Sequence, residues 1–169
     1  VLISQAIHTM DLALTLTGPV TCVTAMTGTT GLHRMEAEDV AVSGLRFANG
    51  ALGWLTASTA SFPGASESIT LHFERGSLRR AEGVLHVDWR DGRTETHGAA
   101  ATTGGGADPM AFTHDWHTWV LEDFVNAVTS GQAPAIAGRD ALAAHQLIHA
   151  ITVSAETGTR FFYNKPDAP

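Results

Sequence analysis

The segment with the clearest capacity for chemistry is Ser4-Gln5-Ala6-Ile7-His8-Thr9-Met10-Asp11. Histidine gives or takes a proton near neutral pH, which makes His8 a candidate general acid or base. Asp11 follows three residues later, one turn along a helix, where its carboxylate can fix the tautomer of the imidazole. The same spacing also suits a half-buried histidine satisfied by its neighbour, so the pattern leaves both interpretations open.

Two further histidine pairs have spacings that can chelate a metal ion on a helix. His114 and His117 are three residues apart, and His145 and His149 are four apart. The segment between His145 and His149 lacks the glutamate of the zinc-protease motif, and no third ligand is visible nearby in the sequence. We therefore expect ordinary surface or boundary histidines and no metal site.

Phosphate-binding and nucleophile motifs are missing from the sequence. It contains no Gly-x-Gly-x-x-Gly between a strand and a helix, no P-loop and no Gly-x-Ser-x-Gly elbow. We therefore expect that this chain alone binds no dinucleotide and has no Rossmann domain.

The elements that must position these residues follow from periodicity and turn residues. Ser4 has the residue type of an N-cap, and apolar spacing predicts a helix to about Leu16, closed by Gly18-Pro19. A long glycine-rich stretch, 98–111, is expected to be a mobile surface loop. Further strands are predicted at 20–27, 40–47, 52–61, 69–73, 85–89 and 160–163, and further helices at about 113–129 and 139–157.

The expected fold class is therefore α+β, a mostly antiparallel, open-faced sheet of about six to eight strands with helices on one face. Asn49-Gly50 marks a hairpin, and Gly131 and Gly158 have the residue type of helix C-caps. The apolar positions expected to share the inner faces of the two later helices are Trp116, Val120, Phe124 and Val128, then Leu142, Leu147, Ile151 and Val153.

Composition excludes several classes of partner. The chain has 169 residues, a formal net charge of -7, one lysine and scattered arginines, so it offers no basic surface for nucleic acid or anionic membranes. No apolar stretch reaches the ~20 residues that span a bilayer. Cys22 is the single cysteine and cannot form an internal disulfide, which favours a cytoplasmic location. Because the sequence begins at Val1 and enters a helical pattern at once, we expect it to be part of a longer protein.

The order of these features resembles the C-terminal domain of the Gfo/Idh/MocA family, named after glucose-fructose oxidoreductase and inositol dehydrogenase. No single motif is diagnostic, but their order and spacing run over nearly the whole chain. The matching segments are Val1 to Leu12 with its His-x-x-Asp, Glu38-Asp39-Val40-Ala41, Arg46 to Gly53, Phe62-Pro63-Gly64, Gly76-Ser77-Leu78, His117, Asp123-Phe124, Ala127-Val128, Gly131, Pro134, Ala150-Ile151 and Ser154 to Gly158.

The resemblance implies a fold like the C-terminal domain of glyceraldehyde-3-phosphate dehydrogenase. Residues 1–169 would be one domain for substrate binding and oligomerisation. The parent protein would be an oxidoreductase of a sugar, cyclitol or related polyol. Its NAD or NADP would be bound by an N-terminal nucleotide-binding domain, absent here together with the Glu-Lys-Pro motif that supplies a catalytic lysine. This chain alone would bind no cofactor.

By the same resemblance His8 is the acid/base for the substrate hydroxyl, supported by Asp11. Ser4, Gln5 and His117 are expected to contact the substrate. Many relatives carry Asp or Asn where this chain has Ser4, so a carboxylate that would assist His8 is not supplied there. Lys165-Pro166 stands in the polar tail after the last predicted strand, the wrong place for the family's catalytic lysine.

Two other functions stay open from the sequence. One is a non-catalytic sugar-sensing or scaffold relative that uses the same sheet domain. The other is a metal-dependent hydrolase or lyase built on the histidine pairs. Because a sheet with helices on one side leaves its other face uncovered, we also expect a homodimer or homotetramer formed through that face.

Overall fold

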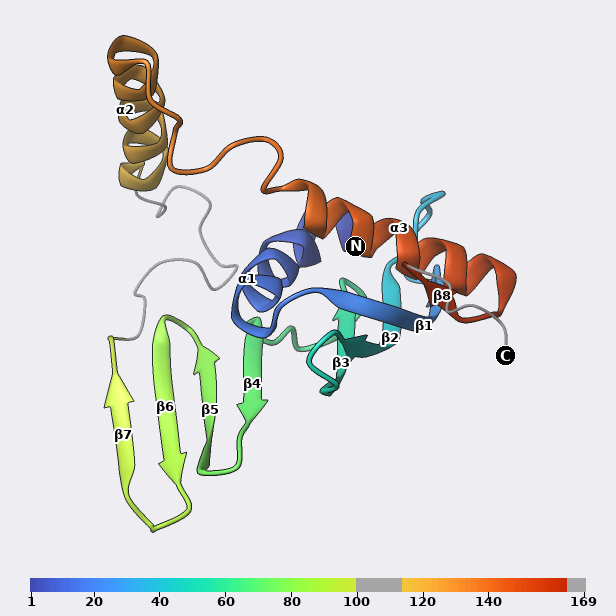
Figure 1. Ribbon diagram of the computed structural model, residues 1–169. Coiled ribbons are helices and arrows are strands. Elements are labelled where there is room, and N and C mark those ends of the chain that lie inside the picture. Colours follow the sequence, from blue (N-terminus) through green and yellow to red (C-terminus); the bar gives the residue numbers. More distant parts are fainter. Residues whose placement is uncertain (100–113, 164–169) are drawn as a thin grey trace, which may run out of the picture. The chain divides into compact units, whose positions relative to one another are not determined.

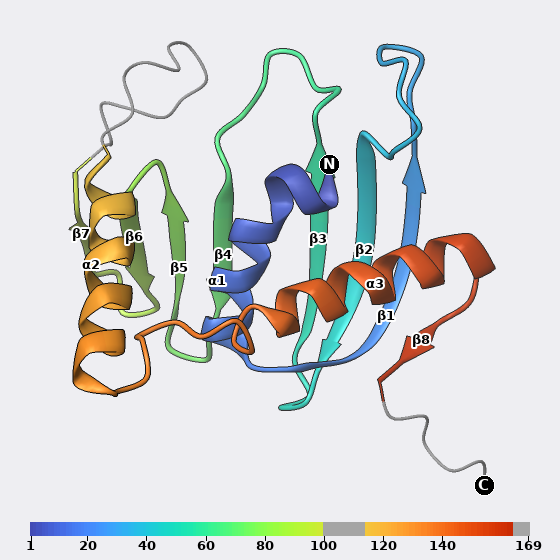
Figure 2. The ribbon, with the colours of Figure 1, turned by 90° about the horizontal axis from the view of Figure 1, so that it is seen from above.

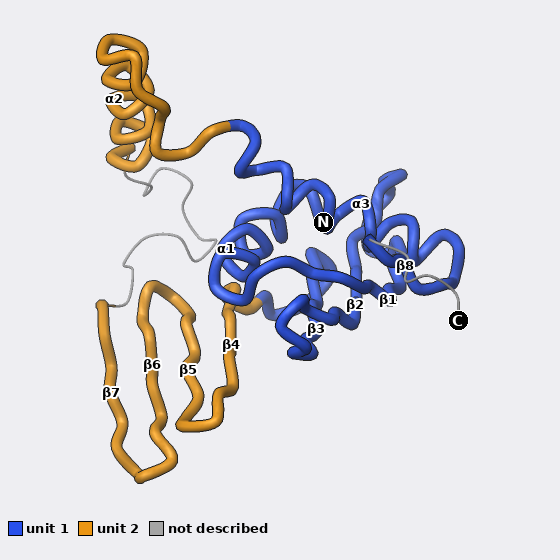
Figure 3. The backbone as a smooth tube through the Cα atoms, in the orientation of Figure 1, with its two compact units in different colours: residues 1–64, 138–169 blue, residues 65–137 orange. Residues whose placement is uncertain are grey.

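The structure, a computed structural model, describes residues 1–99 and 114–163. These residues form two compact units: the first comprises 1–64 and the C-terminal part from 138, and the second comprises 65–137 (Figure 3). Most of the predicted glycine-rich loop and the Lys165-Pro166 pair lie outside the described residues.

The first unit contains a four-stranded antiparallel sheet in the order β3-β2-β1-β8 (Figure 1). Gly50, with φ of 88°, forms the predicted turn between β2 and β3, a conformation that glycine adopts without strain. The four strands are β1 (Val20–Gly28), β2 (Val40–Phe47), β3 (Leu52–Ser58) and β8 (Phe161–Phe162).

Three helical elements belong to the same unit. A π-helical turn, η1 (Leu2–Ala6), leads directly into α1 (Ile7–Thr17), and α3 (Leu142–Thr157) follows much later in the chain. Both α1 and α3 lie over one face of the sheet (Figure 2). The predicted placement of helices on one side of the sheet is therefore confirmed for this unit.

An apolar layer between these helices and the sheet forms the core of the first unit. Met10 of α1, Ile151 of α3 and Val23 of β1 are fully buried in it. Leu142 was expected to share this burial but is exposed, because it is the first residue of α3. Gly53 is required here for space, since a Cβ atom would lie 2.9 Å from the ring of Phe47.

One buried hydroxyl joins α3 to the edge of the sheet. The neighbouring strand β8 pairs only with Cys22 and Val23, so β1 has no strand partner on that side further along. At that point Ser154 Oγ accepts a hydrogen bond from the Ala25 amide at 3.0 Å and donates to the Thr159 carbonyl at 2.7 Å. Ser154 thereby satisfies backbone groups that would otherwise be buried without a partner.

The second unit contains a four-stranded antiparallel meander with two unlike faces. Cross-strand neighbours place Leu71, Leu78 and Val87 in one row on one face, and Thr70, Arg79 and His86 in the adjacent row on the other. One face of this sheet is therefore mainly apolar and the other polar. The strands are β4 (Ser68–His72), β5 (Gly76–Ala81), β6 (Val84–Trp89) and β7 (Thr94–His97).

Helix α2 (Asp115–Ser130) also belongs to the second unit, and its apolar face is exposed. Trp116, Val120, Phe124 and Val128 were expected on an inner face, but each is more than half exposed and Trp116 reaches 73%. Only Ala127 of this helix is buried. The apolar periodicity of α2 thus predicts the helix correctly without identifying what covers it.

The observed architecture confirms the predicted α+β class and antiparallel strands. It differs from a single continuous sheet, because the loop between β3 and β4 separates two four-stranded sheets. Helices α2 and α3 end at Gly131 and Gly158, both in the left-handed conformation, as predicted. None of the helices in the described part of the chain is both long and apolar enough to cross a membrane.

Replacement of Ser154 by alanine tests the link between α3 and β1. We expect Ser154→Ala to lower the free energy of unfolding by about 1–3 kcal/mol, because it leaves the buried Ala25 amide without an acceptor. Thr157→Ala is the matched control, since its exposed hydroxyl bonds a carbonyl of the same helix. Equal stability losses in the two variants, measured by urea unfolding, would contradict this account.

Candidate functional site

The candidate site lies on the first two helical elements. Ser4 and Gln5 belong to the π-helical turn η1, and His8 and Asp11 belong to α1. All four are exposed, whereas Leu2 and Met10 on the opposite side of the same elements are buried. The core thus fixes which side of the helix faces outward and presents the four polar residues together.

The structure does not join His8 to Asp11. Within the described residues, neither side chain makes a hydrogen bond or ion pair, although they share one exposed face. His8 is therefore free to meet a ligand. The supporting role of Asp11 stays a prediction, because it requires a contact absent from this arrangement.

The start of this helical segment corrects the prediction for Ser4. Ser4 lies inside the π-helical turn and caps nothing; the turn begins at Leu2 without a local side-chain cap. The Leu2 amide instead donates to Glu38 Oε1 at 2.9 Å, and the same oxygen lies 3.0 Å from the nitrogen of Val1. A carboxylate 36 residues away in sequence thus accepts the hydrogen bond of the first amide of η1.

The residue after Glu38 organises the adjacent end of the sheet. Asp39 has an exposed fraction of 0%, and its carboxylate accepts hydrogen bonds from the Thr30 hydroxyl at 2.6 Å and the Thr30 amide at 2.8 Å. The Nδ1 atom of His33 lies 2.8 Å from the second oxygen. Through its backbone, Asp39 also bonds the Gly28 carbonyl and the Thr59 amide.

These contacts determine the charge state of Asp39. The hydroxyl of Thr30, helped by the ring of His33 and the Thr30 amide, lowers the pKa of Asp39 from 3.8 to about 2 despite its burial. The carboxylate is therefore ionised at neutral pH. In the sequence Glu38 and Asp39 contribute only to the family resemblance, and no local pattern shows that Glu38 anchors η1 and Asp39 the loop before β2.

The remaining histidines of interest lie elsewhere. His117 is exposed on α2 in the second unit, so the structure does not determine its position relative to His8. His145 and His149 are exposed on α3, where the ring of His149 packs edge-on against Phe161. Within the described residues no group of three or more histidine, cysteine or acidic side chains could hold a metal ion.

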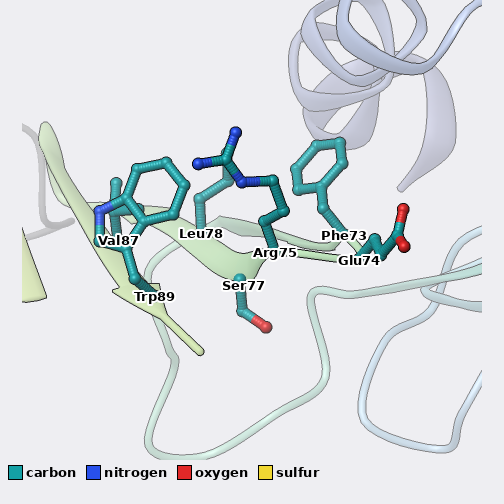
Figure 4. A pocket seen from close by; sticks show the side chains of 8 residues that line it. Phe73, Glu74, Arg75, Ser77, Leu78, Val87 and Trp89 are labelled. Atoms are coloured by element: carbon teal, nitrogen blue, oxygen red, sulfur yellow. The ribbon is translucent and has the colours of Figure 1, made fainter. Parts of the chain in front are cut away.

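A shallow hollow of about 440 Å³ lies on the apolar face of the second sheet, beside Phe73, Leu78, Val87 and Trp89. Figure 4 shows Phe73, Leu78 and Trp89 extending to one side of the sheet and Ser77 to the other. The Arg75 guanidinium carbon lies 5.8 Å from the centre of the Trp89 ring, a cation–π distance. None of the predicted site residues lines this hollow.

Comparison with known proteins gives a family match and similar folds. Residues 1–79 match the family described as the GFO/IDH/MocA C-terminal domain. A search of curated proteins returns no match.

Three solved structures illustrate the similarity of fold. An oxidoreductase from Agrobacterium radiobacter, in complex with NAD+, L-tartaric acid and magnesium, is 23% identical with a TM-score of 0.75, over 96% of this chain and 48% of that one. The WlbA dehydrogenase from Bordetella pertussis, in complex with NADH and UDP-GlcNAcA, is 28% identical with a TM-score of 0.70, over 95% and 44%. Levoglucosan dehydrogenase, in complex with NADH and levoglucosan, is 21% identical with a TM-score of 0.73, over 94% and 49%.

The resemblance found in the sequence is therefore confirmed, and so is the fold. This chain spans about half the length of the solved structures that it matches. Similarity of fold does not by itself assign a reaction, since one fold carries many functions.

The state of Asp39 yields a prediction about acid stability. Because its pKa is lower in the folded chain than the ordinary 3.8, its ionised form stabilises the fold above about pH 4, and this contribution is lost as pH falls through about 2. We expect Asp39→Asn to lower the Tm at pH 7 and the difference from the wild type to shrink toward pH 2.

Glu36→Gln is the control for this experiment, because it removes one negative charge from an exposed position in the same loop. A Tm difference that is the same at pH 7 and pH 2 would show that the Asp39 carboxylate does not act through its charge.

Proposed function

We propose that this chain, of which residues 1–79 match the GFO/IDH/MocA C-terminal domain family, is the substrate-binding and subunit-contact part of an NAD(P)-dependent oxidoreductase. The substrate class is a sugar, a cyclitol or a related polyol. The proposal is supported by the solved structures of similar fold, two of which are dehydrogenases in complex with NADH and a sugar or sugar nucleotide. The complete protein would act in the cytoplasm.

The observation that carries the proposal is the exposed polar face at the start of the domain. Ser4, Gln5 and His8 point away from the core on two consecutive helical elements, so a ligand can reach them together. The buried side chains of Leu2 and Met10 hold these elements against the core, which fixes the spatial arrangement of the three polar side chains. Preorganised polar groups of this kind suit the binding of a substrate with several hydroxyl groups.

The cofactor has no site of its own in this chain. No Gly-x-Gly-x-x-Gly occurs among the 169 residues, so the residues present do not provide a dinucleotide-binding turn. We assign the binding of NAD or NADP to a nucleotide-binding domain in the remainder of the parent protein. When bound there, the nicotinamide supplies the hydride acceptor or donor.

The work of this chain is then to bind the substrate and manage its proton. The imidazole of His8 takes the proton from the reacting hydroxyl of the substrate while the carbon that bears this hydroxyl becomes a carbonyl. In the reverse reaction His8 returns the proton. Ser4 and Gln5 bind neighbouring hydroxyls of the substrate. His117 of α2 contributes a further substrate contact, and Asp11 supports His8 only if substrate binding draws the two together.

The uncovered face of the first sheet supports the proposal of a homo-oligomer. Met26 and Trp54, on the face away from the helices, have exposed fractions of 73% and 74%. Val42 lies opposite Met26, and Trp54 lies opposite Gly44, which has no side chain. These residues form an apolar surface suited to pairing with a second copy in a dimer or tetramer.

Removal of the His8 imidazole tests the catalytic assignment. In the complete protein we expect His8→Ala to lower kcat by about 10²- to 10⁴-fold, the usual contribution of an acid–base group. Affinity for NAD(H) or NADP(H), measured by fluorescence titration, should stay within about twofold because His8 lies outside the nucleotide-binding part.

The control for His8 is His145→Ala, which removes an exposed histidine from α3. Full turnover in the His8 variant would overturn its assignment as the acid/base. A wild-type protein that binds a sugar but never turns it over would instead support the non-catalytic alternative.

The oligomer proposal is tested by placing a charge on the apolar sheet face. We expect Trp54→Glu to weaken self-association by at least about tenfold, because a carboxylate buried in an apolar interface loses its hydration. Phe62→Glu changes an aromatic residue that is 99% exposed but lies outside the strands, and should leave association unchanged. A wild type that sedimentation velocity shows to be strictly monomeric would contradict the proposal.

A further inference from the structure

Glu38 occupies an unusual place in the first unit, because its carboxylate reaches from the loop before β2 to the first amide of the helical segment that carries the candidate site. Within the described residues, neither η1 nor α1 has a local side-chain cap. The first amides of a helix have no intrahelical acceptor and need an outside one. Glu38 Oε1 provides it for Leu2 at 2.9 Å.

A carboxylate suits this position for two reasons. It accepts a charge-assisted hydrogen bond, which is shorter and stronger than a neutral one. It also places a negative charge where the helix dipole is positive. Burial opposes ionisation of Glu38, but the hydrogen bond from the Leu2 amide favours the carboxylate and acts to lower its pKa.

The position of Glu38 is itself fixed by the residue that follows it. Asp39 is fully buried, holds Thr30 and His33 through its carboxylate, and joins the ends of β1 and β3 through its backbone. The Glu38 backbone therefore cannot move without breaking contacts at the end of the sheet. A rigid support of this kind can transmit a defined position to the turn that it holds.

The turn that Glu38 holds carries the proposed substrate contacts. Ser4 and Gln5 lie two and three residues after Leu2, and His8 lies in the first turn of α1. The apolar anchors Leu2 and Met10 fix the helix against the core. Glu38 adds the polar restraint at its first turn, where the π-helical geometry departs from a regular helix.

We propose that Glu38 is a positioning residue for the site: from the loop before β2 it sets the location of Ser4 and Gln5 by capping the π-helical turn at Leu2. The proposal rests on the proposed function for its kinetic consequence. Its structural part, the cap itself, is independent of any activity.

The test uses three variants of the complete protein. Glu38→Ala removes the acceptor, Glu38→Gln keeps an amide oxygen that still accepts from Leu2, and Glu36→Ala changes an exposed glutamate of the same loop as the matched control. The first readout is hydrogen–deuterium exchange at the Leu2 amide, resolved by mass spectrometry with fragmentation. We expect Glu38→Ala to accelerate this exchange about tenfold, the scale of losing a helix cap, and Glu38→Gln to restore most of the protection.

The second readout separates positioning from stability. We expect Glu38→Ala to raise the KM for the sugar or polyol severalfold while the KM for NAD(P) stays unchanged, and Glu38→Gln to recover the substrate KM. Faster exchange at Leu2 with unaltered kinetics would overturn the positioning role. Glu38 would then be a helix cap with a structural role only. Unaltered exchange at Leu2 would overturn the contact.

The outcomes also distinguish this proposal from the proposed function. A wild-type protein without dehydrogenase activity would refute the function, and with it the kinetic part of the proposal. The exchange at Leu2 would still decide whether Glu38 holds the turn.

Discussion

Burial of one face of the first sheet beneath α1 and α3 is the constraint on which the candidate site depends. Met10, Ile151 and Val23 lose essentially all contact with water in this layer. Burying a large apolar side chain contributes roughly 1.5–3 kcal/mol, so even this small set fixes the helices firmly. The direction in which His8 points is a consequence, since the buried side of α1 determines the exposed one.

The apolar layer sets the approximate positions of the helices, and hydrogen bonds from polar side chains fix these positions more closely. Ser154 joins α3 to β1 beyond the end of β8, and the buried Asp39 carboxylate holds Thr30 and His33 in the loop before β2. Each satisfies groups that would be costly to bury alone. Glu38, the neighbour of Asp39 in sequence, bonds the turn that carries Ser4 and Gln5. The site is therefore supported from the sheet end as well as from the core.

Apolar surfaces that are exposed within the described residues include the outer face of β1–β3 and the apolar side of α2. Monomeric proteins rarely expose large contiguous apolar patches, so surfaces of this kind mark contacts with other protein surfaces. For the sheet face we propose a second copy of the chain. The exposed position of His117 on α2 means that its role depends on how that helix sits in the complete protein.

Much of the local structure could be predicted from the sequence alone. Periodicity predicted α1, α2 and α3, alternation predicted most strands, and Asn49-Gly50, Gly131 and Gly158 correctly marked a turn and two helix ends. These predictions are correct because helices, strands and turns depend on residues that lie only a few positions apart in the sequence. The order of short motifs also gave the family resemblance that the match over residues 1–79 confirms.

The contacts that hold the candidate site could not be predicted from the sequence and become visible in the folded chain. Ser4 has the residue type of a helix cap, but the acceptor is Glu38, 36 residues from Leu2, and no hydrogen bond or ion pair joins His8 to Asp11. Periodicity likewise showed that α2 has an apolar face without showing whether this chain covers it. Contacts between distant residues depend on which surfaces the fold brings together, and no local pattern records them.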